Sequence, residues 1–382
     1  MPWKESTAVS ERVEFINEAY QRDGNFSELC DRYGISRTTG YKWLKRYSES
    51  GLEGLQERSR RPHHSPNRTS PENEEAILRI RQHHPSWGGV KINAYLTRQG
   101  WQGLPAPSTV TAILYRHGQI NPQESIKHRP MQRFERQTPN ELWQMDFKGH
   151  FKIDQGYCNP LTILDDHSRF LLGLHACPNQ TWRTVQTHLT HTFRQYGLPD
   201  RMLMDNGSPW GDERQTPHTI LTAWLMRLGI AISHGRPYHP QTQGKDERLH
   251  RTLQAELLDQ IKLSTLMDCQ HHFDTWRDFY NLERPHQALI HAVPAERYSP
   301  SPRPFPEVLP PILYEPDDVV RMVDVAGKIS FHGKCFRISK AFRHYPLAIR
   351  PTQQDGLFDI FFCSFKVANI DFHEDNYVSE DV

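Results

Sequence analysis

The sequence predicts a multidomain protein with helical units at the N-terminus, a mixed α/β domain in the middle and a small β-barrel at the C-terminus. Three observations predict it. Apolar residues recur at helical spacing over residues 9–118, strand and helix patterns alternate over 142–261, and strand patterns follow a proline-rich stretch at 300–311. The 382 residues also exceed the length of one typical domain.

Composition narrows the class of protein. No apolar stretch approaches the roughly 20 residues that span a bilayer, and the charged first residues do not resemble a secretory signal, so we expect a cytoplasmic protein without membrane association. The six cysteines are dispersed without a CxxC pair, which predicts buried thiols rather than disulfides or a zinc site. Residues 1–139 hold 21 Lys and Arg against 15 Asp and Glu, a net charge of +6 that favours a polyanionic partner.

The first unit, residues 1–57, has the pattern of a helix-turn-helix domain. Helices are expected over 9–20, 26–33 and 37–45, with Gly34 ending the second and Ser36 capping the third. Tyr41, Trp43 and Leu44 are expected to pack inside. The outward face, which would read DNA, carries Arg37, Thr38, Thr39, Lys42 and Lys45. An ordinary helical hairpin with a solvated basic face is the alternative.

A second helical unit lies between two basic linkers. The linker 58–70 contains Arg58, Arg60 and Arg61, and it either follows a phosphate backbone or is a solvated tether. Residues 71–121 begin with a serine cap and a proline at the first helical position, and they form a second unit of the helix-turn-helix kind. Residues 122–139 form the second linker.

Residues 140–299 alternate between strand and helix patterns. The expected elements are a strand over 142–153, two strands within 160–176 joined by a turn at 165–168, a helix over 181–196, a strand over 201–204, a helix over 221–228, a strand over 230–233 and a helix over 247–261. This order matches an RNase H-like domain. Residues 300–382 should form the small β-barrel, with strands over 319–325, 328–338, 347–350 and 357–365.

Three carboxylates stand out in the central domain. Asp146 and Asp205 end two of the expected strands, at the edge where open α/β sheets place their ligands, and Glu247 lies in the first turn of a helix. Oxygen ligands of this kind suit Mg²⁺ or Mn²⁺, and a pair of such ions can drive in-line phosphoryl transfer. Taken singly, each acid is more often a solvated or capping residue. Asp165 and Asp166 lie in a turn and are interpreted as structural.

Four segments carry a resemblance to a known family. They are Trp143–Phe147, Asp205–Pro209, Arg236–Arg248 and Tyr280–Leu289. In this order they closely resemble the DDE transposases of bacterial insertion sequences with a retroviral-integrase-like catalytic core, and the best match is the insertion-sequence 481 family. The resemblance spans roughly residues 10–300.

The resemblance implies that Asp146, Asp205 and Glu247 are the catalytic and metal-binding triad, holding two Mg²⁺ ions for which Mn²⁺ can substitute. Asp246 is the neighbouring alternative, but the family's acid directly precedes Arg in its Gly-Lys-x-Glu-Arg motif, which selects Glu247. The 42-residue step from Asp205 is longer than in many members, and a surface loop over 210–219 could hold the extra residues.

Further residues are expected to contact DNA near the cut. They are Tyr238, His239, Lys245, Arg248 and Arg251. A solvated basic helix face is the alternative for the last three. Arg284, Pro285 and His286 match a family motif, but only a structural role can be justified for them.

The expected function is that of a transposase. It would bind the terminal inverted repeats of its element, hydrolyse a phosphodiester and join the freed 3′-hydroxyl to target DNA. Its partners would be double-stranded DNA and further copies of itself, as a homodimer or larger assembly, in a bacterial cytoplasm at the nucleoid. The alternatives are a transposase-derived DNA-binding regulator without catalysis and an RNase H-fold nuclease.

Overall fold

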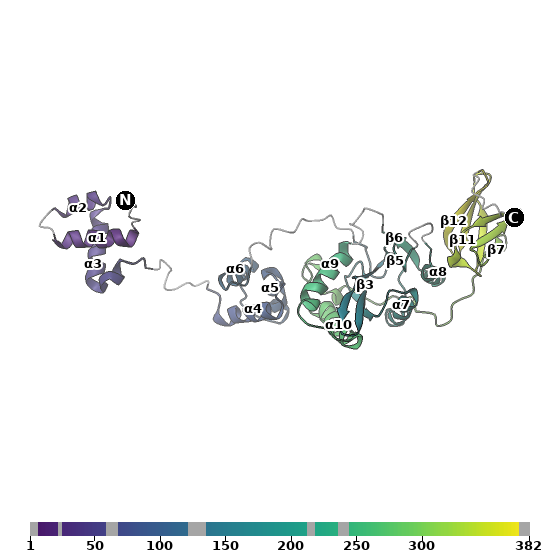
Figure 1. The fold of residues 1–382 in the computed structure, drawn as a ribbon, viewed down its shortest axis with the longest axis horizontal. Coiled ribbons are helices and arrows are strands. Elements are labelled where there is room, and N and C mark those ends of the chain that lie inside the picture. Colours follow the sequence, from purple (N-terminus) through teal and green to yellow (C-terminus); the bar gives the residue numbers. More distant parts are fainter. Residues whose placement is uncertain are drawn as a thin grey trace. The chain divides into compact units, whose positions relative to one another are not determined.

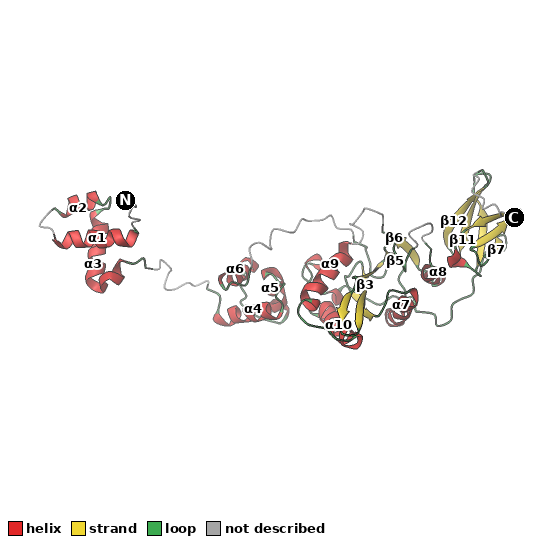
Figure 2. Ribbon diagram, in the orientation of Figure 1, coloured by secondary structure: helices red, strands yellow, loops and turns green. Residues whose placement is uncertain are grey.

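The computed structural model describes residues 7–21, 25–58, 68–120, 135–211, 218–235 and 244–373. These residues fall into two compact units, Met1–Arg68 and Thr69–Val382. Figure 1 labels the helices and strands along the chain, and Figure 2 separates them by type. No helix in the described parts is long and apolar enough to cross a membrane.

The first unit contains three helices, α1 (Ala8–Gln21), α2 (Phe26–Arg32) and α3 (Arg37–Ser50). Ser36 caps α3 by accepting a hydrogen bond from the backbone N–H of Thr39 at 3.2 Å, as the sequence predicts. Gly40 lets α3 approach α2 closely, since a Cβ there would lie 2.7 Å from Cys30 Sγ. The unit therefore depends on glycine at this contact.

Of the three side chains of α3 that were expected to pack inside, two do so and one does not. Trp43 is buried as expected, and Leu44 packs against the same core. Tyr41, by contrast, is 60% exposed and lies against Phe26 with ring centroids 4.4 Å apart. Its interpretation as a core residue was wrong, because position 41 faces outward, next to the exposed Lys42.

The second unit begins with three helices, α4 (Pro71–His83), α5 (Gly89–Arg98) and α6 (Pro107–Arg116). They enclose their own small core around Trp87, Ile77 and Ile92. They also contact the central domain, because His84 and Trp87 stack on Phe279, with centroids 4.9 and 5.8 Å away. The helical unit is thus docked on the domain that follows it.

A six-stranded mixed sheet forms the centre of the central domain, residues 135–299. The strands are β1 (Trp143–Phe147), β2 (Phe151–Ile153), β3 (Gly156–Asp165), β4 (Leu171–Cys177), β5 (Arg201–Met204) and β6 (Ala231–His234). They follow the order β2–β3–β1–β5–β6, with β4 also paired to β3. The pairs β1–β5 and β5–β6 are parallel, whereas β1–β3 and β3–β4 are antiparallel.

Helices cover both faces of this sheet. One face packs on α7 (Trp182–Tyr196) and α8 (Ile220–Arg227), and the other packs on α9 (Gly244–Leu253) and α10 (Leu266–Leu282). Between α9 and α10 the chain forms a π-helical turn at Gln254–Leu258. The arrangement is the expected RNase H-like α/β layer.

Several expected boundaries differ from the structure. The strand expected over 142–153 is two strands, because the chain turns at Gly149, whose φ is +101°. The helix expected over 247–261 begins three residues earlier and leaves α-geometry at Gln254. Trp210 was expected in a surface loop but is only 1% exposed, since it stacks on Phe147 in the core.

The C-terminal domain has two antiparallel sheets over one core. Its strands are β7 (Val319–Met322), β8 (Lys328–Phe331), β9 (Lys334–Arg337), β10 (Pro346–Pro351), β11 (Leu357–Phe362) and β12 (Phe365–Asp371). One sheet runs β12–β11–β10–β7, and β8–β9 form a hairpin where a single strand over 328–338 was expected. Ala223 and Met226 of α8 share this core, so the C-terminal domain packs on the central domain.

Candidate active site and nucleic-acid interface

Asp146 and Asp205 lie at the ends of neighbouring parallel strands. Asp146 belongs to β1, and Asp205 directly follows β5. In this pair Gln144 lies opposite Leu203, and the same register continued by two residues places Asp146 opposite Asp205. Because adjacent strands lie about 4.8 Å apart, the sheet brings the two carboxylates to one place on its edge.

Glu247 approaches the same edge from α9, in whose first turn it lies exposed. The negative charges of Asp205 and Glu247 both act on the pKa of Asp146. This pKa is raised to about 7 by burial and then by the negative charge of Asp205, against a hydrogen bond from the backbone of Phe147, with a further increase from Glu247. The site therefore has an excess of negative charge.

Asp246, the alternative to Glu247, is buried instead. Its side chain is 1% exposed, and burial together with the charges of Asp146 and Asp166 raises its pKa well above the usual range. Its Oδ1 has no hydrogen-bond partner among the described residues. Glu247 is thus the acid on α9 that solvent, a metal ion or DNA can reach.

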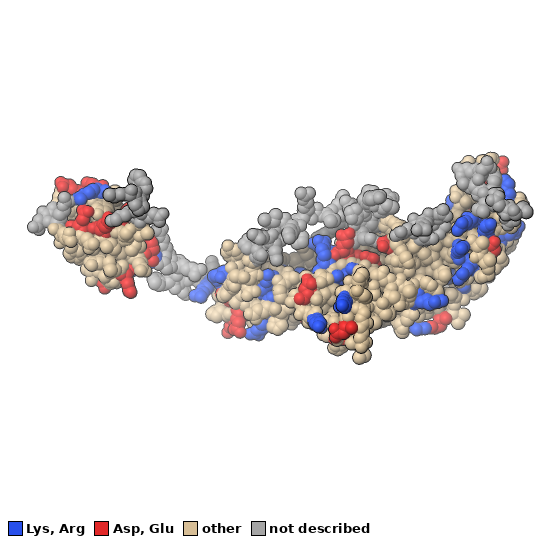
Figure 3. Space-filling model, in the orientation of Figure 1, with Lys and Arg blue, Asp and Glu red and all other residues tan. Residues whose placement is uncertain are grey.

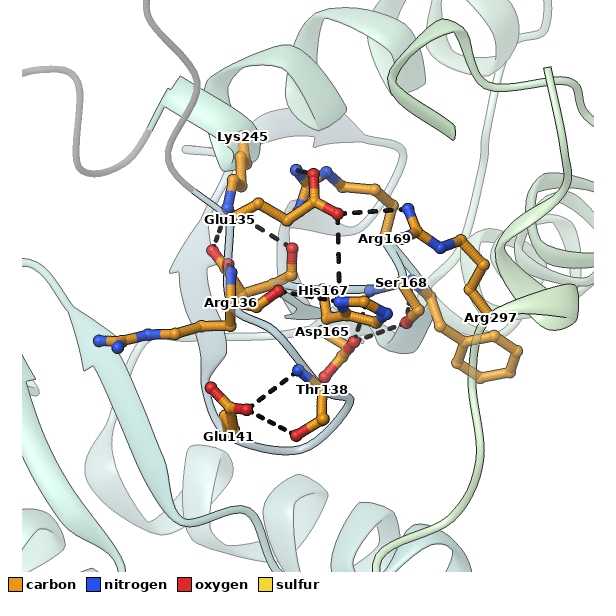
Figure 4. A network of polar contacts seen from close by, with 12 residues as sticks. Glu135, Arg136, Thr138, Glu141, Asp165, His167, Ser168, Arg169, Lys245 and Arg297 are labelled. Atoms are coloured by element: carbon orange, nitrogen blue, oxygen red, sulfur yellow. Dashed lines mark hydrogen bonds and ion pairs between the residues drawn. The ribbon is translucent and has the colours of Figure 1, made fainter. Parts of the chain in front are cut away.

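A polar network lies around the turn after β3, which is level with the start of β1 (Figure 4). Asp166 accepts hydrogen bonds from Gln144 Nε2 at 2.6 Å and from the backbone N–H of Arg136 at 2.9 Å, and it also binds the amine of Lys245. Asp165 accepts from Ser168 Oγ at 2.6 Å. Both turn aspartates are buried and bonded within the domain, in keeping with a structural role.

The side chains expected to contact DNA are placed unevenly. On α3, Arg37, Thr38, Lys42 and Lys45 are exposed, while Thr39 is half-buried beside its cap. Arg58, Arg248 and Arg251 are exposed, but Lys245 turns towards Asp166 and its side chain is only 18% exposed. Arg60, Arg61, Tyr238 and His239 lie outside the described residues.

His250 and Thr162 are site residues that the sequence reasoning missed. Thr162 pairs with Asp146 across β3 and β1, and its hydroxyl lies 2.9 Å from His250 Nε2. His250 Nδ1 lies 4.0 Å from Asp146 Oδ2. Burial and the charge of Lys148 lower the pKa of His250 to about 4, so at neutral pH this contact is not an ion pair. The signal was its position one helical turn after Glu247.

The donor set fits a divalent cation by its chemistry. Three carboxylates supply oxygen ligands, which Mg²⁺ and Mn²⁺ prefer, and the raised pKa of Asp146 marks a place where positive charge is lacking. Among the described residues no three His, Cys, Asp or Glu side chains are already arranged to hold an ion. The acids therefore lie near one sheet edge but are not arranged as the ligands of a bound ion.

A cavity of 760 Å³ lies between the central and C-terminal domains. Its walls include the segment after Asp205, with Ser208 and Pro209, and the capping residues of α7 and α8, Thr181 and Thr219. The C-terminal domain contributes three cations to it, namely Arg337, Lys340 and Arg343. Figure 3 shows Lys and Arg atoms spread over the visible surface of this domain. The cavity suits an anionic chain such as a phosphodiester backbone.

Replacing Asp146 by asparagine should stabilise the protein in the absence of metal. When the pKa of an acid is higher in the folded than in the unfolded state, the protein loses stability as pH rises between the two values, here from about 4 to about 7. At pH 8 the charged carboxylate carries its full cost, so Asp146→Asn should raise the free energy of unfolding by about 2–4 kcal/mol. At pH 4 the gain should nearly vanish, which urea unfolding at both pH values would test.

Family comparisons agree with this architecture. The sequence matches the integrase core domain over residues 136–240 and a second integrase core domain over 228–294. Residues 11–63 match a helix-turn-helix domain, and 39–114 match a homeodomain-like domain. Residues 318–377 match the C-terminal domain of the IS481 family transposases.

Individual relatives cover parts of the chain. The Gag-Pro-Pol polyprotein of Simian retrovirus SRV-2 is 28% identical over 47% of this chain and 9% of its own length. An uncharacterised 31.7 kDa protein of insertion element IS407 from Burkholderia multivorans is 23% identical over 42% of this chain and 55% of its own. The chain thus spans less than a tenth of the retroviral polyprotein and about half of the insertion-element protein.

Among solved structures, the simian T-cell lymphotropic virus intasome in complex with the PP2A regulatory subunit B56 gamma is similar. It shares 16% identity over 78% of this chain and 96% of its own, with a TM-score of 0.38. At that score the similarity does not establish a shared fold, and the fold assignment rests on the family matches.

The chain thus combines helix-turn-helix domains, an integrase core domain and a region that matches the C-terminal domain of the IS481 family transposases.

Proposed function

We propose that this protein cuts and joins DNA at the ends of its own insertion sequence. The proposal is supported by the register of β1 with β5, which places Asp146 and Asp205 at one sheet edge, and by the charges of Asp205 and Glu247, which both raise the pKa of Asp146. Water would attack the phosphodiester at the element end and release a 3′-hydroxyl. That hydroxyl would then attack target DNA, so no covalent protein–DNA intermediate is needed.

Asp146, Asp205 and Glu247 would hold two Mg²⁺ ions, and Mn²⁺ would substitute for them. When bound, the ions supply Lewis-acid activation of the attacking oxygen and charge stabilisation of the leaving one. The protein's own contribution is to place Asp146 and Asp205 on adjacent strands and to leave Glu247 at the solvent-facing start of α9. Gly207 assists, because its N–H donates to Asp205 Oδ1 at 3.1 Å.

DNA recognition is assigned to the N-terminal helices. The exposed face of α3 presents Arg37, Thr38 and Lys42, and Ser36 holds the start of this helix where a recognition helix meets base edges. Arg58, Arg60 and Arg61 of the linker would add backbone contacts, as would Tyr238, His239, Arg248 and Arg251 near the cut. Lys245 would have to leave Asp166 before it could contribute.

Assembly and location follow from the same proposal. Two element ends must be processed together, so a homodimer or larger assembly on DNA is expected, with the bacterial nucleoid as the place of action. The C-terminal cations at the cavity, Arg337, Lys340 and Arg343, would hold one of the DNA strands close to the segment that follows Asp205.

Substituting Lys42 by alanine should weaken binding to the element end and flatten its salt dependence. Each lost phosphate contact lowers the slope of log affinity against log salt by about 1. Fluorescence anisotropy with a terminal-repeat duplex at several salt concentrations measures this slope. Arg32→Ala is the matched control, because Arg32 is an exposed cation of the same unit that pairs with Glu18 at 2.9 Å and lies outside α3. Equal effects of both substitutions would contradict the assignment of α3.

The experiment that tests the function uses a labelled duplex carrying the inverted repeat that flanks the reading frame. With Mg²⁺ or Mn²⁺, the wild-type protein should nick at the repeat end and join that end to a second DNA. Binding without nicking would favour the regulator that lacks catalysis. Cleavage of an RNA–DNA hybrid in preference to the repeat would favour the nuclease.

A further inference from the structure

The contact between His250 and Thr162 fixes which nitrogen of the histidine carries its proton. The Thr162 hydroxyl has one hydrogen and two partners, the backbone carbonyl of Asp146 at 3.0 Å and His250 Nε2 at 2.9 Å. A carbonyl oxygen can only accept, so it receives the hydroxyl hydrogen. His250 Nε2 must then donate to Thr162, which leaves Nδ1 of the neutral ring with a free lone pair.

That lone pair is directed towards the catalytic acids. His250 Nδ1 and Asp146 Oδ2 are 4.0 Å apart, which is too far for a direct hydrogen bond and suits one water molecule that donates to both. The two side chains are 14% and 25% exposed, so water can reach this position. The ring itself cannot swing away easily, because Thr162 lies within β3 and holds Nε2.

We propose that His250 orients the attacking water in the hydrolytic step, an inference that rests on the proposed function. Accepting a hydrogen bond at Nδ1 turns the oxygen lone pair of the water away from the ring and towards the scissile phosphorus. The new P–O bond forms as the bond to the 3′-oxygen breaks. That oxygen leaves as the 3′-hydroxyl after taking a proton, and the water gives one proton to solvent, so one water is consumed.

Joining should depend much less on His250. There the nucleophile is a 3′-hydroxyl whose position is fixed by the DNA strand to which it belongs, whereas a free water has only its hydrogen bonds to place it. A comparison of the two steps therefore distinguishes two roles for His250. If it orients water, its loss should impair hydrolysis alone, whereas if it supports the metal-binding acids, its loss should impair both steps.

The substitution His250→Gln separates the two roles of the ring. The glutamine amide can still donate to Thr162 from near the position of Nε2, but it offers no acceptor at the position of Nδ1. We expect hydrolysis of an intact end to fall by roughly 10²-fold and joining of an end supplied with its 3′-hydroxyl already free to fall by less than about 3-fold. Thr162→Val, which releases the ring, should show the same imbalance in weaker form.

Equal loss of hydrolysis and joining in His250→Gln would overturn the inference, since His250 would then support the acids or the fold. Full hydrolysis in this variant would overturn it too. Wild-type protein that performs neither step would instead refute the proposed function. An independent readout without metal is the ¹⁵N spectrum of histidine-labelled wild-type protein at pH 7, with the His250 signal assigned by its loss in His250→Gln. An unprotonated Nδ1 is expected, and a protonated one would contradict the proposal.

Discussion

Asp205→Asn should abolish both cleavage and joining while leaving binding to the element ends unchanged. The carboxylate directly follows β5, the parallel neighbour of β1, and its charge is the largest charge effect on the pKa of Asp146. An amide of the same shape keeps the packing against Gly207 but removes the negative charge that a divalent ion needs. We expect a loss of roughly 10³-fold or more, equal to about 4 kcal/mol of transition-state stabilisation.

Gel assays of nicking and joining, run beside a binding assay on the same duplex, measure this effect. Asp154→Asn is the matched control, because Asp154 is an exposed acid in the turn between β2 and β3. It should retain full activity. Joining by Asp205→Asn at the wild-type rate would remove Asp205 from the site.

Glu256→Ala should be the most destabilising of these substitutions. Glu256 is 4% exposed in the π-helical turn. Both of its carboxylate oxygens accept a bifurcated hydrogen bond from Arg284 Nε, and Oε1 also accepts one from Nη2, all at 2.9–3.1 Å. It also accepts from Trp87 Nε1 at 2.9 Å, and Lys91 Nζ lies 3.7 Å away. Burial is the largest single effect and opposes ionisation, but the charge and hydrogen bonds of Arg284, the charge of Lys91 and the hydrogen bond from Trp87 together outweigh it and lower the pKa of Glu256.

Removing the carboxylate leaves Arg284 buried without its counter-charge and frees the indole of Trp87. The expected loss is about 3–5 kcal/mol in the free energy of unfolding. The double substitution Glu256→Leu with Arg284→Leu is the control, because a buried ion pair replaced by apolar side chains often costs little. Denaturant unfolding of both variants measures the difference, and a loss below about 1 kcal/mol in Glu256→Ala would contradict the structure at this contact.

This cluster also explains the motif at residues 280–289. Arg284 is the partner of Glu256, and Tyr280 packs edge-on against His286 with centroids 4.5 Å apart. The motif therefore has a structural role: through Glu256 it holds Trp87 and Lys91, and so positions the helical unit 71–116 on the central domain.

Local signals in the sequence predicted the elements that they determine. The helix expected over 181–196 is α7, capped by Thr181 and ended by Gly197 at a φ of +79°, and the strand expected over 201–204 is β5 to the residue. The alignment of Asp146 with Asp205 followed, because both stand where a strand ends. Elements that depend on residues close together in the sequence can be predicted without knowledge of the tertiary structure.

Features that depend on distant contacts were not predictable. Nothing near Trp210 shows that it will stack on Phe147, and nothing near Glu256 shows that Arg284 and Trp87 will meet it. The His250 contact has the same origin, since Thr162 lies 88 positions away in the chain. The ion pair of Lys245 with Asp166 was not predicted either, because the two residues are far apart in the sequence. Lys245 was therefore expected to face DNA.

The proposed function is tested most directly by one reaction. Purified wild-type protein is incubated with Mg²⁺, a labelled duplex ending in the flanking inverted repeat and an unlabelled target DNA. The proposed function predicts a nick that leaves a 3′-hydroxyl at the repeat end, followed by a labelled product joined to the target. Tight binding of the repeat with neither nick nor joined product, in Mg²⁺ or in Mn²⁺, would contradict it.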